Sequence, residues 1–251
     1  MSLYVILPGM NNFFYQIIII LLTFVSSLVA QEDTHSSCQN LTTVWSVISV
    51  GLVGTLFGMY KKYIDSYKKL KEENQLLKEK EEELSYLATT DYLTQLYNRR
   101  YCIETGEKLF QLAKRNERPL SVIIFDIDDF KQVNDTYGHK VGDAVLVSLG
   151  IKLSHNSRAS DLVCRFGGEE FVILLPDTKL EDALFIAEKL RGIIADLRIK
   201  TERKYLGVTV SMGIATIDFR EDQSIEDIIK RADHALFMAK KSGKNKVEVY
   251  R

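Results

Sequence analysis

Two groups of acidic residues stand at the ends of apolar segments. Asp126 ends one apolar run, and Asp128 and Asp129 follow it directly. Glu169 and Glu170 come after a glycine pair that separates two further runs. If these segments pair as strands, Asp126 and Glu169 offer the hard oxygen ligands that Mg²⁺ prefers beside substrate phosphates, and the ion would activate a hydroxyl nucleophile. Acids in such places also form turns and cap helices, so a purely structural role stays open at this point.

The elements that must position these acids alternate along residues 89–251. The glycine pair, 167–168, suits a tight hairpin with positive φ at its tip. We predict strands at 120–126, on both sides of 167–168, at 207–215 and at 246–250, and helices at 99–116, 142–153, 180–197 and 225–241. This order predicts an α+β domain with a ferredoxin-like βαββαβ core and extra elements.

The first 60 residues differ from the rest in charge. Residues 1–30 contain no Asp, Glu, Lys or Arg, although the chain carries 33 basic and 34 acidic side chains. Uncharged apolar stretches at 13–30 and 41–60 are each near the ~20 residues that span hydrocarbon, so we predict a membrane anchor with two spans. A cleaved signal peptide ending at Ala30 is the alternative for the first stretch.

Basic residues after the second stretch predict the orientation. Five lysines follow it at positions 61, 62, 68, 69 and 71. Because basic residues near a span end favour the cytoplasm, we expect a multi-pass protein of the inner (plasma) membrane with everything after Tyr60 cytoplasmic.

Residues 61–88 carry a heptad pattern that begins at Tyr60. One seam position holds Tyr60, Tyr67, Asn74, Glu81 and Ala88, and the other holds Tyr63, Leu70, Leu77 and Leu84. An Asn in the seam favours a two-stranded, in-register pairing, so we predict a short parallel coiled coil and a homodimer. A single solvated helix is the alternative, because the stretch is rich in Lys and Glu.

Composition excludes some functions. The formal net charge is −1, with no basic surplus that would displace counterions from a nucleic acid, so we expect no DNA or RNA polymer as a partner. Cys38, Cys102 and Cys164 lack metal-ligand spacing and are predicted to be three ordinary thiols.

A series of motifs resembles the GGDEF family of diguanylate cyclases. The string GGEEF at 167–171 looks like the family's signature. The further matches are DYLTQLYNRR at 91–100, FDID at 125–128, ND at 134–135, GH at 138–139, GD at 142–143, VSMGIA at 210–215, AK at 239–240 and GKN at 243–245. An ordered series at family-like spacings is far more specific than one five-residue string.

The resemblance implies an enzyme that condenses two GTP molecules into cyclic di-GMP and two pyrophosphates. The implied cofactor is Mg²⁺, two ions per half-site, with Mn²⁺ as a substitute. Asp126 and Glu169 are expected to bind the metal through carboxylates, and Ile127 through its main-chain carbonyl. Glu169 would also assist deprotonation of the ribose 3′-hydroxyl. Glu170 would support the metal or Lys131, which meets the phosphates, although Glu170 as a merely structural acid is the alternative.

The same resemblance implies a guanine site. Asn134 and Asp143 match the reading positions, since a carboxylate that accepts from guanine's amino and imino groups discriminates against adenine. His139 lies between them in the sequence and is expected to contact the nucleotide, with a capping or buried role as the alternative.

Phosphate contacts are implied at the start and the end of the domain. Main-chain amides near Asp129 and Phe130 could donate to phosphate oxygens, as turn nests do. Lys240 and Lys244 resemble the family's terminal pair, in which the second residue is usually Arg. Lys keeps the charge but lacks the bidentate fork of Arg. Exposed solubilising lysines are the alternative.

An RxxD sequence before the hairpin matches the family's inhibitory site. Arg158 and Asp161 would bind the product, so that cyclic di-GMP inhibits its own synthesis from a distant site. Arg191 is a candidate for a secondary contact, and a surface ion pair is the alternative for the RxxD residues.

Three rival functions differ from the cyclase in kind. A non-catalytic receptor for cyclic di-GMP or GTP, acting through a protein partner, would be expected to have lost Asp126 or Glu169, and neither is lost. A cyclase with a mixed or mononucleotide product is disfavoured by Asp143. A membrane scaffold has no positive feature beyond the predicted dimer.

Overall fold

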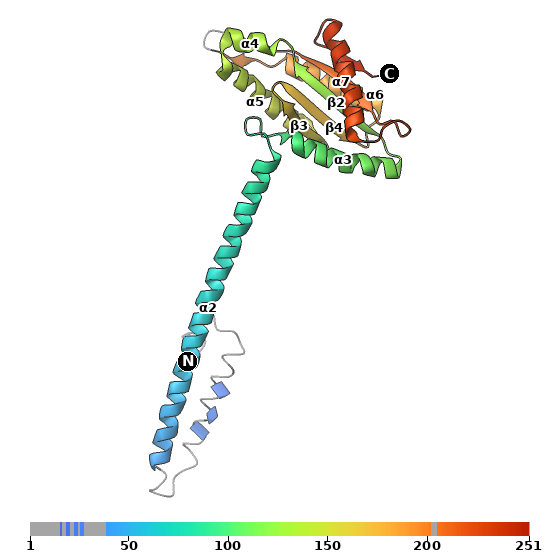
Figure 1. Ribbon diagram of the computed structural model, residues 1–251. Helices are drawn as coiled ribbons and strands as arrows, with labels where there is room; N and C mark the ends of the chain where they lie inside the picture. The colour runs from blue at the N-terminus through green and yellow to red at the C-terminus, as the bar shows by residue number, and fades with distance from the viewer. Residues whose placement is uncertain are drawn as a thin grey trace. The chain divides into compact units, whose positions relative to one another are not determined.

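The computed structural model describes residues 39–201 and 205–250, together with residues 16, 19, 20, 23, 24, 26 and 27 (Figure 1). The chain divides into two compact units, Met1–Lys80 and Glu81–Arg251. Most of the first predicted span, 13–30, lies outside the described residues, and so does Cys38.

One long helix, α2 (Gln39–Thr89), contains 51 residues and includes both the second predicted span and the predicted stalk. Within the described residues it is the one helix long and apolar enough to cross a membrane, judged by length and composition alone. The seam leucines Leu70, Leu77 and Leu84 are 52–66% exposed in the single chain. These leucines form an exposed apolar stripe along this part of α2.

The second unit is built on a mixed six-stranded sheet with the strand order β1-β3-β4-β2-β7-β8 (Figure 1). Its strands are β1 (Tyr97–Asn98), β2 (Leu120–Ile127), β3 (Leu162–Gly167), β4 (Glu170–Pro176), β7 (Val210–Thr216) and β8 (Val247–Val249). A separate two-stranded sheet pairs β5 (Ile199–Lys200) with β6 (Tyr205–Leu206). The helices are α3 (Arg99–Asn116), α4 (Phe130–Tyr137), α5 (His139–Asn156), α6 (Leu180–Ala195) and α7 (Ile225–Lys241).

The four central strands pair antiparallel, and β2 lies between β4 and β7. Along the chain, β2, the α4 and α5 helices, β3, β4, α6 and β7 follow the predicted βαββαβ order. The edge strands β1 and β8 are the extra elements, and each pairs parallel with its neighbour. The α+β fold expected from the sequence is therefore confirmed, and the parallel pairing of the two edge strands makes the sheet mixed.

Helices cover both faces of the sheet, which explains why all eight residues of β2 are buried. Because side chains alternate across a strand, Ile123 and Phe125 pack in one core with α5 and α6, while Val122 and Ile124 pack in the other with α3 and α7. Gly213 of β7 lies so close to α7 that a Cβ atom there would overlap main-chain atoms of Ala232 and Leu236. Residue 213 must therefore be glycine for α7 to reach its place.

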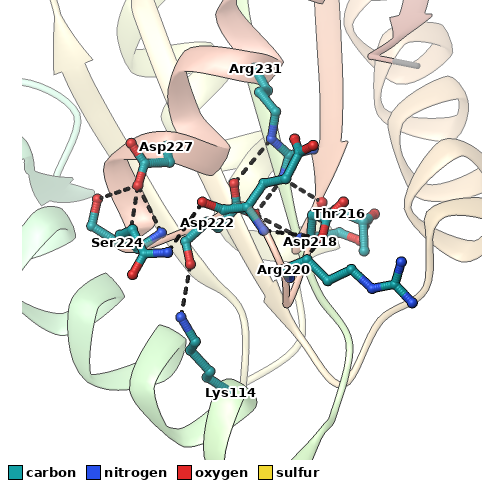
Figure 2. Close-up of polar contacts among 11 residues, drawn as sticks. Lys114, Thr216, Asp218, Arg220, Asp222, Ser224, Asp227 and Arg231 are labelled. Atoms are coloured by element: carbon teal, nitrogen blue, oxygen red, sulfur yellow. Dashed lines mark hydrogen bonds and ion pairs between the residues drawn. The ribbon is translucent and has the colours of Figure 1, made fainter.

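A polar network fixes the connection from β7 to α7 (Figure 2). Arg231 donates to the Asp222 carboxylate and, at 2.8 Å, to the carbonyl of Thr216. The Asp218 main-chain N–H donates to the same carboxylate at 2.7 Å, and Lys114 Nζ donates to the Asp222 carbonyl at 2.9 Å. These bonds tie the start of α7 to the end of β7 and to α3.

The structure corrects one expectation about cysteine. Cys102 of α3 and Cys164 of β3 form a disulfide inside the core between α3, α7 and the sheet, so these two are not ordinary thiols. Their Cα atoms are 6.1 Å apart, within the usual range for a disulfide. The two cysteines are 62 residues apart in sequence, and only the packing of α3 on β3 brings them together.

Candidate active site

Asp126 stands near the end of β2, with Glu170 of β4 on one side and Ser211 of β7 on the other. Its side chain is nearly buried, and Lys240 Nζ, from the last turn of α7, lies 2.8 Å from Asp126 Oδ1. A cation at a helix C-terminus is favoured by the helix dipole. The close packing of α7 on Gly213 therefore delivers a positive charge to the end of β2.

The hairpin that carries Glu169 turns between Gly167 and Glu170, which face each other in the ladder. Gly168 has φ of +25°, as predicted for the tip. Glu169 is half-buried and Glu170 is exposed.

Arg165 holds the tip of this hairpin from within β3. Its Nε and Nη2 atoms donate to the Gly168 carbonyl at 3.1 and 2.8 Å, and its Nη1 donates to the Asp91 carboxylate at 3.0 and 3.2 Å. Asp91 belongs to the motif at 91–100 but no role was predicted for it, and no role was predicted for Arg165. An arginine two residues before a glycine pair was the available signal.

Burial raises the pKa of Asp126, and the negative charge of Asp128 adds to the effect, while the hydrogen bond and charge of Lys240 oppose it. Burial also raises the pKa of Glu169, helped by the charges of Asp126 and Glu170 and opposed by Lys240. The two carboxylates are therefore near enough to repel each other. A divalent cation would relieve that repulsion, and two carboxylates suit a hard oxygen-seeking ion.

The residues predicted to bind metal lie together at one end of the sheet. Ile127 is the last residue of β2 and directly follows Asp126. Among the described residues, no group of three or more His, Cys, Asp and Glu side chains is placed to hold a metal. A metal here would depend on two carboxylates, the predicted main-chain carbonyl and the substrate.

The guanine-reading candidates come from two consecutive helices. Gly142 of α5 packs so closely on α4 that a Cβ atom would overlap Asn134 Oδ1 and approach Phe130 to 3.3 Å. Asn134 is half-buried, while Asp143, the next residue after Gly142, is exposed. Because Gly142 has no Cβ, the Asn134 side chain can lie against the first turns of α5, next to the residue that precedes Asp143. His139, the first residue of α5, is exposed rather than buried.

Phe130 begins α4, and its side chain is buried in the core. The main-chain amides in the first turn of a helix lack intrahelical acceptors and can bind anions. Asp128 and Asp129 are the two residues between β2 and α4, and the φ of +55° at Asp129 turns the chain into the helix. No helix was predicted from the sequence at the position of α4.

The three candidate phosphate lysines have different settings. Lys240 pairs with Asp126, as described above, and Lys131 is exposed on α4. Lys244 Nζ lies 2.6 Å from Asp129 Oδ1, and this hydrogen bond raises the pKa of the lysine. Asp126, Asp129, Lys240 and Lys244 therefore form an array of alternating charge at the carboxyl end of β2.

Arg158 and Asp161 lie between α5 and β3. The Arg158 main-chain N–H donates to Asp161 Oδ2 at 2.8 Å, and the Asp161 N–H donates to the Arg158 carbonyl at 3.0 Å, so the two form a tight turn. Both line a cavity of about 320 Å³, together with Gln95, Leu96, Tyr97, Ser154, Ser157, Ala159 and Val163. The exposed Arg158 guanidinium is not used to hold this turn.

Comparison with known proteins places the chain in a family. A sequence model described as "Diguanylate cyclase, GGDEF domain" matches residues 88–246, which is more than half of the chain. The chain therefore belongs to the GGDEF family of diguanylate cyclase domains.

Individual relatives agree with this assignment. The response regulator PleD of Caulobacter vibrioides is 44% identical over 163 residues, covering 64% of this chain and 36% of PleD. A coiled-coil and GGDEF structure of DgcB from Caulobacter crescentus in complex with c-di-GMP has a TM-score of 0.67 at 28% identity and covers 70% of this chain and 93% of that one. The active GGEEF domain of a diguanylate cyclase from Vibrio cholerae has a TM-score of 0.58 at 36% identity, with 61% and 97% covered. The matched region makes up 36–45% of the length of the curated relatives.

Proposed function

We propose that the chain is a diguanylate cyclase that joins two GTP molecules into cyclic di-GMP. The observation that carries this is the pair of mutually repelling acids, Asp126 and Glu169, each with a raised pKa and each near the Lys240 ammonium. One buried and one half-buried carboxylate, at the end of a strand and at a hairpin tip, suit a divalent ion that also binds substrate phosphates.

Asp126, Glu169 and the Ile127 carbonyl would hold the divalent ion, Mg²⁺ or its substitute Mn²⁺. When bound, the metal supplies charge neutralisation at the phosphates and a lowered pKa for the attacking hydroxyl. In the reaction, each ribose 3′-oxygen forms a bond to the α-phosphorus of the other GTP, the bond to pyrophosphate breaks, and the hydroxyl proton leaves. Glu169 would assist removal of that proton, and the exposed Glu170 would support the metal or Lys131.

The chain's own groups bind the rest of the nucleotide. Lys240, Lys244 and Lys131 would neutralise the phosphates, with the main-chain amides at Phe130 as donors. Asn134 and Asp143 would read guanine, and the exposed His139 would contact the nucleotide. Lys240 and Lys244 presently pair with Asp126 and Asp129, so binding would exchange carboxylate partners for phosphate and metal.

Two copies are needed because each half-site presents one GTP. The exposed seam of α2 supports a parallel homodimer, which would hold two domains at high effective concentration. We further propose that residues 41–60 of α2 cross the inner membrane, that residues 13–30 form a second span, and that the catalytic domain, 89–251, is cytoplasmic. The apolar character of α2 and the lysines after Tyr60 support this arrangement.

Product inhibition through Arg158 and Asp161 is part of the proposal. The supporting feature is the cavity beside their turn, with an arginine free to pair with guanine or phosphate edges. The DgcB complex shows that a related domain binds c-di-GMP.

The test uses the full chain in detergent or a lipid nanodisc. With GTP and Mg²⁺ it should release cyclic di-GMP and pyrophosphate, and chelation of the metal should stop it. Glu169→Gln should lose at least about 100-fold in rate, since removal of one charge-stabilising group commonly costs that much. Asp177→Asn, an exposed acid paired with Arg118, is the matched control and should keep full activity.

A folded dimer that binds GTP or cyclic di-GMP and never releases pyrophosphate would favour the receptor alternative. Inhibition by added product that persists in Arg158→Ala would remove the inhibitory-site assignment and leave the cyclase intact.

A further inference from the structure

The turn that carries Lys244 has an unusual backbone. Gly243, Lys244 and Asn245 have φ angles of +112°, +58° and +46°, three left-handed residues in succession. Asn tolerates this region and Gly is free to adopt it, but Lys is not favoured there. Such a conformation persists only where neighbouring contacts hold it, and these positions gather at functional sites.

Four hydrogen bonds hold the turn in place. The Lys244 N–H donates to the Ala239 carbonyl at 3.1 Å, which closes the end of α7. The Met212 N–H donates to the Lys246 carbonyl at 2.9 Å. The remaining two involve Asn245: its main-chain N–H donates to Asp128 Oδ2 at 3.0 Å, and Arg191 Nη1 donates to its side-chain oxygen at 2.9 Å.

Asp128 connects this turn to the sheet. The residue is only 8% exposed. Besides the Asn245 N–H, it accepts from Thr209 Oγ1 at 2.7 Å and from Ser211 Oγ at 2.6 Å. All three of these donors are uncharged. Together they satisfy the buried carboxylate and fix its orientation, and its charge also attracts the Lys244 ammonium.

We propose that Asp128 is a positioning residue for GTP binding, which fixes the 243–245 turn so that Lys244 faces the triphosphate. Arg191 braces the same turn from α6. The inference rests on the proposed function, because it requires Lys244 to bind phosphate. It assigns Asp128 no contact with the metal, the nucleotide or the reacting atoms.

A merely structural role for Asp128 makes a different prediction. Loss of a structural bond lowers stability and weakens every ligand alike, whereas loss of a positioning bond weakens only ligands that reach Lys244. The ligands to compare are a GTP analogue that cannot be cleaved at the α–β linkage, which carries the full triphosphate, and GMP, which lacks the β- and γ-phosphates.

The experiment measures binding of both ligands to the full-length protein in detergent with Mg²⁺ present. Asp128→Ala and Lys244→Ala should each weaken the GTP analogue about 10-fold, the order of a lost charge-assisted contact, and should change GMP binding less than about twofold. The double variant should also lose about 10-fold rather than about 100-fold, because both changes remove the same contact. Asp128→Asn, which keeps one acceptor oxygen, should lose less than Asp128→Ala.

Arg191→Ala provides a second route if Asp128→Ala does not fold. It removes the brace on Asn245 from outside the site and should weaken the GTP analogue selectively, by about threefold. Asp177→Asn is again the control, with both affinities unchanged.

The outcomes separate the inference from the proposed function. If Lys244→Ala weakens the GTP analogue while the Asp128 and Arg191 variants do not, or if the losses at Asp128 and Lys244 multiply, the inference is wrong and the phosphate site stands. If Asp128→Ala weakens GMP as much as the GTP analogue, its role is structural. If Lys244→Ala changes neither ligand, the phosphate assignment itself is wrong.

Discussion

The carboxylates near the two ends of α7 have pKa values shifted in opposite directions. At its N-terminal end (Figure 2), main-chain N–H groups lower the pKa of Asp218 and Asp227, and Asp222, only 1% exposed, is paired with Arg231. At its C-terminal end, burial raises the pKa of Asp126 and Glu169, although Lys240 lies nearby. The acids at the first end are satisfied within the protein, whereas at the second end the Lys240 ammonium does not fully offset the burial and mutual repulsion of Asp126 and Glu169. The direction of the carboxylate pKa shifts thus distinguishes a structural network, where they are lowered, from a candidate active site, where they are raised.

Asp126→Asn should give the largest effect, a loss of about 1000-fold or more in cyclic di-GMP formation, because the proposed metal would lose a carboxylate ligand. The thermal midpoint of the metal-free protein should stay within a few degrees of wild type, since the change removes a charge that burial disfavours. The assay is product release from GTP with a parallel melting curve. Retained activity would contradict the metal assignment.

Asp222→Ala, at the N-terminal end of α7, should lower stability and leave activity nearly unchanged. It leaves the Arg231 guanidinium without its partner in a half-buried place, which should lower the free energy of unfolding by about 3 kcal/mol. Activity per folded molecule at low temperature should stay within a few-fold of wild type. Denaturant unfolding measures the change in stability. A loss of activity without a loss of stability would show that Asp222 serves the active site and not only the fold.

The pH dependence of stability should differ in sign between the ends, beginning with Asp126. Its pKa is raised in the folded protein, so its stabilising contribution is full below the ordinary Asp value of about 3.9 and is lost as pH rises through the raised value. Asp126→Asn should therefore gain stability relative to wild type as pH rises above about 4 in the absence of metal. If the difference in unfolding free energy between the two proteins does not change with pH, the cost of burying the Asp126 charge is fully compensated by its neighbours.

The smallest effects concern the capping box at the start of α7, where the Ser224 side chain and Asp227 bond each other's main-chain N–H groups. Ser224→Ala should cost about 1 kcal/mol with activity unchanged. The lowered pKa of Asp227 means that its contribution is present above about pH 4 and is lost as pH falls further, so Asp227→Asn should approach wild-type stability in acid. Unfolding curves at pH 3 and pH 7 test this.

Local sequence patterns predicted most of the helices and strands of the fold. The predicted helices at 99–116 and 225–241 agree with α3 and α7, and the glycine pair forms the predicted hairpin, because periodicity and turn residues act over a few neighbouring positions. The α4 helix escaped prediction because its eight residues are too few to show a period and its start depends on one left-handed residue, Asp129. The β1, β5 and β6 strands, of two residues each, exist only through their pairing partners.

The sequence by itself determined which groups are available: the acids after β2 and at the hairpin tip, the lysines at the end of α7 and an apolar segment followed by a heptad. Only the tertiary structure decided their partners. Asp128 meets Thr209 and Asn245 across 81 and 117 residues, and Cys102 meets Cys164 across 62. Contacts over such separations depend on strand order and helix packing, which are set by the burial of two whole cores rather than by any short stretch of chain.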